Sequence, residues 1–189
     1  MQTKLNKQSK KNLTVFLDVG DTIIDERTQV HDDQGIVIAA DVIPGADRMV
    51  KDLADKGYTL AVVADGKAQS FKNILTQNGL YDYFAAMIYS ENIKELKPSP
   101  RMFKAAIGAL DLSMQDIPRI VMVGNNLRRD ILGANKLGIT SVHLDWSTRY
   151  STVARVEDEK PDYTIHQPME FIHLIEVLNA QTKVKTNQG

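Results

Sequence analysis

Residues 16–22 read F-L-D-V-G-D-T and close an apolar run, L-T-V-F-L-D, that begins at Leu13. A short run of apolar and β-branched residues that stops at a polar loop is typical of a buried strand in a parallel sheet. Asp18 is the residue at which this run stops. Because ligands of open parallel sheets bind beyond the carboxyl ends of the strands, Asp18 is the first candidate for a functional side chain.

Further strands alternate with amphipathic helices along the chain. The expected strands cover residues 58–64, 86–89, 119–124, 139–144 and, at the edge, 163–166. The expected helices begin at Pro44-Gly45, near residue 68, near Ser99, near Leu127 and near residue 169. This alternation predicts parallel strands joined by right-handed crossovers. We therefore expect one α/β domain, a three-layer α/β/α Rossmann-like parallel sheet.

Composition excludes several classes of function. The chain has 189 residues, a net charge of −1 and no cysteine. Disulfides, thiolate nucleophiles and cysteine-ligated zinc are excluded, and the charge does not favour nucleic acid or an anionic membrane as a partner. No apolar run approaches the roughly 18 residues of a membrane span, and no signal peptide is recognisable. We expect a cytoplasmic protein.

The chain divides into a core and two polar ends. Residues 1–12 are expected to form a disordered basic arm, residues 13–180 the core, and residues 181–189 a disordered tail. Residues 23–43 can form a hairpin flap with Ile23-Ile24 and residues 36–38 as its arms. Residues 32–35, D-D-Q-G, supply its turn.

Polar side chains gather where the expected strands end. They are Asp18, Asp65, Asn125 and Asp145, with Lys97 in a loop before a helix on the same side. Carboxylates opposite a lysine, without a cysteine or histidine pair, indicate a hard cation such as Mg²⁺ and an anionic substrate.

Three segments resemble the motifs of the haloacid dehalogenase superfamily. Residues 16–22 are similar to its D-x-D-x-T motif, residues 96–100 (L-K-P-S-P) to its lysine motif, and residues 123–134 (V-G-N-N-L-R-R-D-I-L-G-A) to its acidic motif, usually G-D-x-x-x-x-D. Their order and spacing agree with that family from about residue 13 to residue 178. The resemblance implies a phosphatase-like member of this superfamily.

The resemblance also implies roles for individual residues. Asp18 would attack phosphorus and form an aspartyl-phosphate, and Lys97 would neutralise Asp18 and a phosphate oxygen. Mg²⁺ would be held by the Asp18 carboxylate, the Gly20 carbonyl and the acidic motif, with Asn125 and Asp130 as its ligands there. Asp130 would alternatively orient Lys97.

Three departures from the motifs weaken this assignment. The family's general acid falls at Gly20, and its first acid in the last motif falls at Asn125. Loss of a general acid typically removes about 10²–10⁴-fold in rate, so substrates with good leaving groups are expected. Asp21 and His31 are the candidate replacements, and neither is favoured.

The third departure concerns the phosphate-binding position. A hydroxyl residue of the family falls at Ala64, which leaves the backbone amides of Asp65 and Gly66 to face the phosphate. Arg128, or its neighbour Arg129, would steer the anionic substrate.

No segment is long enough for the cap domain that many family members carry. About twenty residues separate Thr22 from Pro44, and about thirty separate Ala64 from Lys97. The site is therefore open to a large phosphorylated substrate, or it is covered by a neighbouring subunit in a homo-oligomer. Trp146, Arg149 and Tyr150, which follow an expected strand, can line its mouth or pack on the last helix.

Several functions remain open on these residues. The first is a Mg²⁺-dependent phosphatase, and the alternative is a catalytically impaired protein that keeps the phosphate and metal pocket for regulation or structure. Carbon–halogen hydrolysis and phosphonate cleavage fit less well because both use a cap that this chain lacks.

Overall fold

The computed structural model describes residues 11–186, which are built around one parallel sheet. The six strands run in the order β5-β4-β1-β6-β7-β8. Their bounds are β1 Thr14–Leu17, β4 Thr59–Ala64, β5 Ala86–Tyr89, β6 Ile120–Gly124, β7 Thr140–Leu144 and β8 Tyr163–Ile165. Strand β1 lies at the centre, where Leu17 is in register with Val62 of β4 and Val123 of β6. The expected α/β sheet is confirmed.

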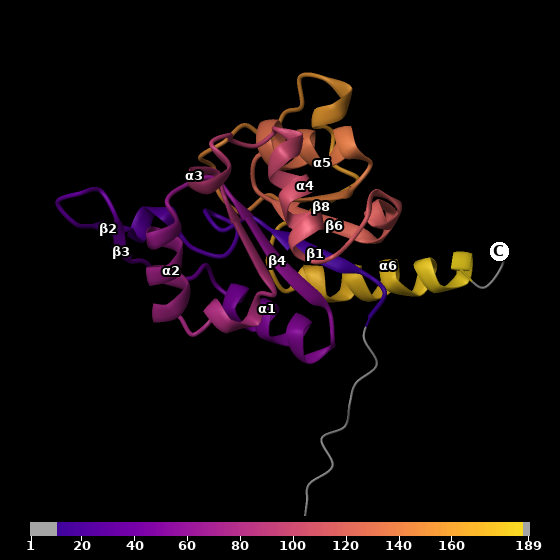
Figure 1. Cartoon of the computed structure of the whole chain (residues 1–189), viewed down its shortest axis with the longest axis horizontal. Coiled ribbons are helices and arrows are strands. Elements are labelled where there is room, and N and C mark those ends of the chain that lie inside the picture. Colours follow the sequence, from indigo (N-terminus) through magenta and orange to yellow (C-terminus); the bar gives the residue numbers. More distant parts are fainter. Residues whose placement is uncertain (1–10, 187–189) are drawn as a thin grey trace, which may run out of the picture.

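Helices cover both faces of the sheet. They are α1 (Ala46–Asp55), α2 (Ala68–Gln77), α3 (Ser90–Ile93), α4 (Pro100–Ala109), α5 (Leu132–Leu137) and α6 (Glu170–Thr186). Figure 1 shows α4 and α5 on one side of the strands, with α1 and α6 on the other.

The hydrophobic core has two halves that follow the pleat of the strands. Val15 and Leu17 pack with residues of α1, α2 and α6, whereas Phe16 packs with residues of α4 and α5. Successive side chains of a strand point to opposite faces, so β1 contributes to both halves. Because both faces of β1 are buried, residues 15–17 of this strand are all apolar.

The flap is a hairpin, but its arms differ from those expected. Strands β2 (Val30–His31) and β3 (Val37–Ala39) pair antiparallel around a turn in which the Asp32 amide donates to the Ile36 carbonyl, 2.9 Å apart. Ile23 and Ile24, expected as one arm, are fully buried in the core. Two adjacent isoleucines gain more from burial than from an exposed hairpin, and the arm therefore forms later in the chain.

The expected ends of the core also shift. Helix α6 continues to Thr186, past the predicted boundary at residue 180, and the Thr182 hydroxyl donates to the Leu178 carbonyl at 3.0 Å. At the other end, the Asn12 amide donates to the Asn179 side chain at 3.1 Å, so the predicted arm ends before this residue. Residues 1–10 and 187–189 lie outside the described part of the chain.

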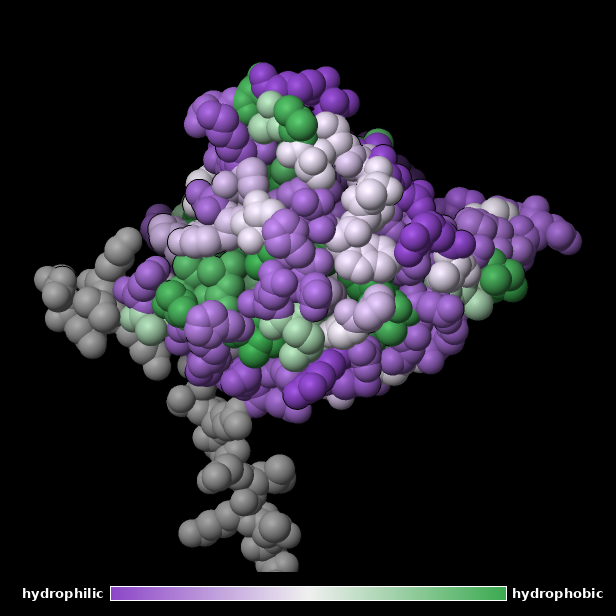
Figure 2. Space-filling view, turned by 180° about the vertical axis from the view of Figure 1, so that it is seen from behind, coloured by the Kyte–Doolittle hydropathy of each residue, from purple (hydrophilic) through white to green (hydrophobic). Residues whose placement is uncertain are grey.

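The surface of the described chain is mixed in character. On the face seen in Figure 2, hydrophobic residues form separate patches among hydrophilic ones. Within residues 11–186, none of the helices has both the length and the hydropathy needed to cross a bilayer.

Candidate active site

A buried lysine joins two carboxylates at the carboxyl edge of the sheet. Lys97 Nζ lies 2.6 Å from Asp18 Oδ1 and 2.6 Å from Asp130 Oδ1. It also donates to the Val63 carbonyl at 2.8 Å. Asp18 follows β1, Lys97 precedes α4, and Asp130 lies in the π-helical turn Leu127–Ile131 after β6. The fold thus brings together three residues that are far apart in the sequence.

Backbone contacts hold each member of this group. The Asp18 amide donates to the Val123 carbonyl of β6 at 3.0 Å, and Asp130 Oδ2 accepts from the Asn126 amide at 3.0 Å. A Cβ at Gly124 would overlap the Asp130 carboxylate, so only glycine lets that side chain turn back toward Lys97. The residues next to Asp18 and Asp130 therefore determine the position of both carboxylates as well as the path of the loops that carry them.

Asp65 positions the lysine loop through its side chain. Its Oδ1 accepts from the Lys97 amide at 2.9 Å, and its Oδ2 pairs with Arg129 Nη1 at 3.3 Å. The expected contribution of Asp65 was its backbone amide. Its carboxylate instead ties the end of β4 to the Lys97 and Arg129 segments.

Charges in the group shift one another's protonation. Burial lowers the pKa of Lys97, but the carboxylates of Asp130, Asp18 and Asp65 outweigh it and hold that pKa above its ordinary value. Burial raises the pKa of Asp130, with the Asp18 charge acting in the same direction and Lys97 opposing it. Lys97 therefore stays an ammonium group that can meet an anion.

A small pocket opens beside these residues. Its volume is about 40 Å³. Its lining consists of Asp18, Gly20, Glu26, Asp65, Lys97, Asn125, Asn126, Arg129, Asp130 and Tyr150. The pocket combines a buried carboxylate, a buried ammonium group and amide side chains, which is a donor set suited to a small anion and a hard cation.

A family model described as haloacid dehalogenase-like hydrolase matches residues 3–144 of this chain. The chain belongs to the haloacid dehalogenase-like hydrolase family. This family assignment agrees with the three motifs and with the place of Asp18, Lys97 and Asp130 in the fold.

Relatives of this chain carry phosphatase names. A glyceraldehyde 3-phosphate phosphatase of Methanopyrus kandleri is 30% identical over 73% of this chain and 56% of the relative. The pyrophosphatase PpaX of Bacillus mycoides is 25% identical over 69% of this chain and 58% of the relative. The chain thus spans less than two thirds of the length of either curated relative.

A solved structure shares the fold. The crystal structure of a HAD phosphatase from Thermococcus onnurineus superposes with a TM-score of 0.69, at 20% identity, over 86% of this chain and 97% of that one. At this identity the likeness shows the fold of the chain alone.

Three residues expected to bind the phosphate lie elsewhere. Ala64 is fully buried in the core, and the Gly66 amide donates to Ser90 Oγ at 2.9 Å, so neither faces the pocket. Arg128 is exposed and outside the pocket lining, whereas Arg129 belongs to that lining. The π-helical turn places the second arginine, rather than the first, on the pocket side.

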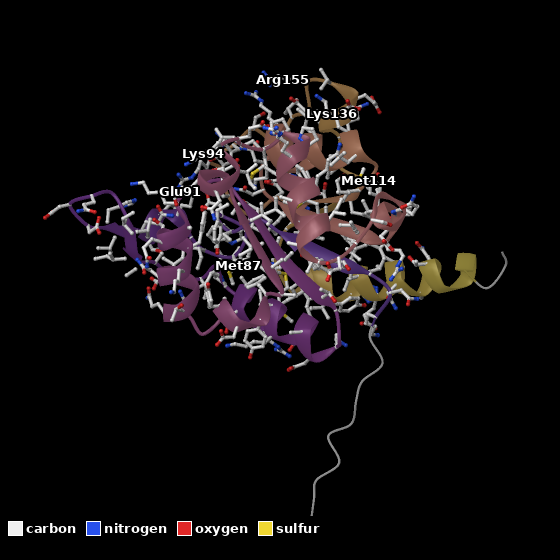
Figure 3. The ribbon with its side chains drawn as sticks, in the orientation of Figure 1. Met87, Glu91, Lys94, Met114, Lys136 and Arg155 are labelled. Carbon is white, nitrogen blue, oxygen red and sulfur yellow. The ribbon has the colours of Figure 1, made fainter. Side chains whose placement is uncertain are left out.

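Side chains of α3 form hydrogen bonds with backbone amides at the start of α2 and just before it. Besides the contact from Ser90, Glu91 Oε2 accepts from the Ala68 amide at 2.9 Å. Figure 3 shows Glu91 on α3 and Lys94 close by, directly after the end of this helix. Side chains of α3 therefore satisfy the Gly66 amide, which we expected to face the phosphate, and the Ala68 amide at the start of α2.

The metal-binding capacity of the pocket is modest. Within residues 11–186, no group of three or more histidine, aspartate or glutamate side chains is arranged to hold a metal. Mg²⁺ is commonly bound by one or two carboxylates together with substrate phosphate and water, so Asp18, Asn125 and Asp130 still fit it. In the same part of the chain, the buried Nδ2 of Asn125 has no hydrogen-bond partner, which indicates a position for a further polar ligand.

Other aromatic and histidine candidates have defined places. Tyr150 lines the pocket, whereas the Trp146 ring lies 5.1 Å from the Arg27 guanidinium. His143 is buried, and its Nε2 lies 3.2 Å from the Asn125 carbonyl, so it supports the backbone of the acidic motif. His31 is exposed on the hairpin.

Glu26 is a pocket residue that sequence reasoning missed. It begins the 3₁₀ turn η1 (Glu26–Thr28), and its Oε2 pairs with Arg149 Nη1 at 2.9 Å. Burial raises the pKa of Glu26, with the Arg149 charge opposing the shift. The segment after Thr22 has no helical or strand periodicity, and the only available signal was an acidic residue shortly after the first motif.

Proposed function

We propose that this chain is a Mg²⁺-dependent phosphatase that uses Asp18 as its nucleophile. The observation that carries the proposal is the 2.6 Å contact of Lys97 Nζ with each of Asp18 and Asp130 at the end of the central strands. This arrangement sets a carboxylate in a buried pocket beside a permanent positive charge, as attack on a phosphate requires.

The reaction runs in two steps on the residues of this pocket. A carboxylate oxygen of Asp18 forms a bond to phosphorus while the bond from phosphorus to the leaving-group oxygen breaks. Water then forms a bond to phosphorus, and the bond between Asp18 and phosphorus breaks, which releases phosphate. Lys97 offsets the charge that Asp18 and the phosphoryl oxygens bring together.

A divalent ion completes the charge balance. The Asp18 carboxylate, the Gly20 carbonyl and the Asn125 side chain would hold Mg²⁺, with Asp130 beside them. Bound Mg²⁺ would reduce the repulsion between the negative nucleophile and the negative phosphate. Gly20 has no side chain to protonate the leaving group, so any proton must come from a neighbouring residue or from water.

The pocket admits a phosphoryl group rather than a whole metabolite. Its 40 Å³ is far below the roughly 300–1,000 Å³ of ordinary ligand pockets. The remainder of the substrate would lie outside it, next to Arg129 and Tyr150, which line the pocket. A large phosphorylated substrate, or a second subunit over the opening, fits this geometry.

Turnover of a phosphate panel with Mg²⁺ tests the proposal. Aryl, sugar and acyl phosphates are offered to the wild type and to Asp18→Asn, which keeps the shape of the side chain but removes its charge. We expect phosphate release by the wild type and a loss of at least about 10³-fold in the variant. Equal residual turnover in both proteins would contradict an enzymatic function.

A phosphate-binding or metal-binding protein without turnover is the second candidate, favoured by the neutral Asn125 and by Ala64. Beryllium fluoride with Mg²⁺ mimics a phosphoryl group on an aspartate. Binding of this complex without turnover of any substrate would support the second candidate.

A further inference from the structure

The carboxylate of Glu26 occupies the space that a side chain at position 20 would fill. A Cβ placed on Gly20 would overlap the Glu26 carboxylate, with Glu26 Cδ only 2.8 Å away. Such proximity is far inside van der Waals contact, so a side chain at position 20 would displace the Glu26 carboxylate from its present place. In this chain, a residue from η1 takes the place of one from the first motif.

A network of contacts holds Glu26 in this place. The Glu26 amide donates to Asp21 Oδ1 at 3.0 Å. Arg149 Nε pairs with Asp21 Oδ2 at 2.8 Å, and Arg149 Nη1 with Glu26 Oε2 at 2.9 Å. Ser147 Oγ donates to Asp21 Oδ2 at 3.0 Å. Arg149 therefore holds one carboxylate oxygen of Glu26, and the other, Oε1, faces Gly20.

The same network removes Asp21 as an acid for the pocket. Asp21 has a φ of +48°, is almost fully buried, and accepts from Glu26, Ser147 and Arg149. Its side chain orients η1 and lies outside the pocket lining. His31, the other candidate from the sequence, is exposed on the hairpin.

The remaining carboxylates of the pocket are engaged with cations or amides of the lysine site. Asp130 contacts Lys97 and the Asn126 amide, and Asp65 contacts the Lys97 amide and Arg129. Glu26 is also paired with a cation, Arg149, through Oε2, but its Oε1 lies next to Gly20, on the side of the pocket formed by the first motif.

We propose that Glu26 is the general acid and base of this pocket and acts from η1 in place of the side chain that position 20 lacks. The assignment rests on the proposed phosphatase function. As the bond between phosphorus and the leaving group breaks, the Glu26 carboxyl gives its proton to the leaving-group oxygen. In the second step, the Glu26 carboxylate takes a proton from water while the water oxygen bonds to phosphorus and Asp18 departs.

This role changes the substrates that the pocket can use. With an acid available, esters with poor leaving groups become substrates, and the restriction that Gly20 alone would impose is relieved. Arg149 and Asp21 are positioning residues, because they hold Glu26 without lining the pocket.

A leaving-group series with Glu26→Gln tests the assignment. The variant keeps the size of the side chain but cannot give a proton. With Mg²⁺ present, we expect Glu26→Gln to lose about 10²–10⁴-fold on phenyl and methyl phosphate and only a few-fold on para-nitrophenyl and acetyl phosphate. The matched control is Asp33→Asn, an equal change of charge on the exposed hairpin turn, which should track the wild type throughout.

A second variant moves the carboxyl back to the first motif. Gly20→Asp combined with Glu26→Ala removes the overlap between the two side chains. We expect this double variant to hydrolyse phenyl phosphate at least about tenfold faster than Glu26→Gln does. Binding of beryllium fluoride with Mg²⁺, measured by calorimetry, should be the same within a few-fold in the wild type and in Glu26→Gln, because the complex forms on Asp18.

The outcomes separate the two proposals. If Glu26→Gln loses the same rate on every leaving group, or loses none on any, the role of Glu26 is overturned. In that case, lower turnover in Asp18→Asn than in the wild type still supports the phosphatase. If the wild type and Asp18→Asn do not differ, the phosphatase fails and the role of Glu26 fails with it.

Discussion

At the scale of single residues, the site depends on a lysine whose charge is buried with its partners. Lys97 is 3% exposed, and Asp130 is 1% exposed. A buried ion pair adds little net stability, because the desolvation of both groups offsets their attraction, but removal of one partner leaves a charge without compensation. Lys97 is therefore required for the fold as well as for the proposed chemistry.

Replacement of Lys97 should show how far the stability of the fold depends on its buried charge. Lys97→Met keeps an unbranched side chain but leaves Asp18 and Asp130 unpaired, and we expect a loss of about 3–5 kcal/mol in the free energy of unfolding. Urea denaturation measures it. Lys104→Met, an exposed change on α4, is the control and should stay within about 0.5 kcal/mol of the wild type. A similar effect of both substitutions would contradict the buried pairing.

Asn125, the neutral residue in the acidic motif, should determine how tightly the pocket binds Mg²⁺. Asn125→Asp adds a carboxylate near Asp18 and Asp130, so we expect Mg²⁺ to bind about tenfold tighter and the metal-free protein to lose stability from repulsion. Melting temperatures in chelator and in excess Mg²⁺ report both effects, since a bound ion stabilises the folded state. An identical Mg²⁺-induced shift in the variant and the wild type would argue against a metal at this position.

The residues of the site differ in how far the sequence could predict them. Asp18, Lys97 and Asp130 stand in motifs at the ends of regular elements, where periodicity and spacing give their place. The place of Glu26 depends on Arg149, more than a hundred positions later, and on the backbone of Asp21. Contacts of that kind leave no periodic pattern in a single sequence.

At the scale of elements, the hairpin is attached to α2 by side-chain hydrogen bonds. Ser70 Oγ accepts from the Val37 amide at 3.0 Å, and Asn73 Nδ2 donates to the Val37 carbonyl at 2.9 Å. Asn78 Nδ2 donates to the Ala40 carbonyl at 2.9 Å. The hairpin is therefore docked against α2 and projects from the edge of the domain beside this helix (Figure 1).

Loss of one of these contacts should loosen the hairpin. In Ser70→Ala, the amide of the buried Val37 has no acceptor, which costs about 1–3 kcal/mol. We expect hydrogen exchange at Val37 to become about ten to a hundred times faster, while α1 and the central strands keep their rates. Thr76→Ala, at an exposed position of the same helix, should leave the exchange of Val37 unchanged. Unchanged exchange in Ser70→Ala would contradict docking through this serine.

The helices and strands also differ in how far the sequence could predict them. The strands and the start of α4 were predictable, because apolar runs mark the strands and Ser99-Pro100 caps the helix. The hairpin arm at Val30–His31 was not, since both residues are exposed and their pairing carries no hydrophobic pattern. The end of α6 was also missed, because residues 181–186 are polar apart from Val184 and form a helix without a continuous apolar stripe.

At the scale of the whole molecule, the order of the strands explains why the site lies where it does. Strand β1 is paired on both sides, so Asp18 follows an interior strand, between the segments after β4 and β6. Those neighbours bring Asp65 and Asn125 to the same edge. The three-layer class was predictable from the alternation of elements, whereas the contacts between loops that complete the pocket came from the folded arrangement.

The stability of the whole fold should depend on pH through His143. Burial lowers the pKa of this histidine, with the Asn125 carbonyl opposing the shift. The unfolded chain therefore binds more protons near and below about pH 6.5, so stability is lost as the pH falls. We expect His143→Gln to reduce the drop in the free energy of unfolding between about pH 7.5 and about pH 5.5. An equal drop in the variant would contradict this account.

The central claim is that Asp18 carries the phosphoryl group during turnover, and acid quench followed by peptide mass spectrometry measures this directly. Wild-type protein is mixed with acetyl phosphate and Mg²⁺ and quenched during the first turnover. The account predicts a phosphoryl group on the peptide that contains Asp18 and none on that peptide in Asp18→Asn. Turnover with the phosphoryl group on another residue, or with no labelled peptide at any quench time, would contradict it.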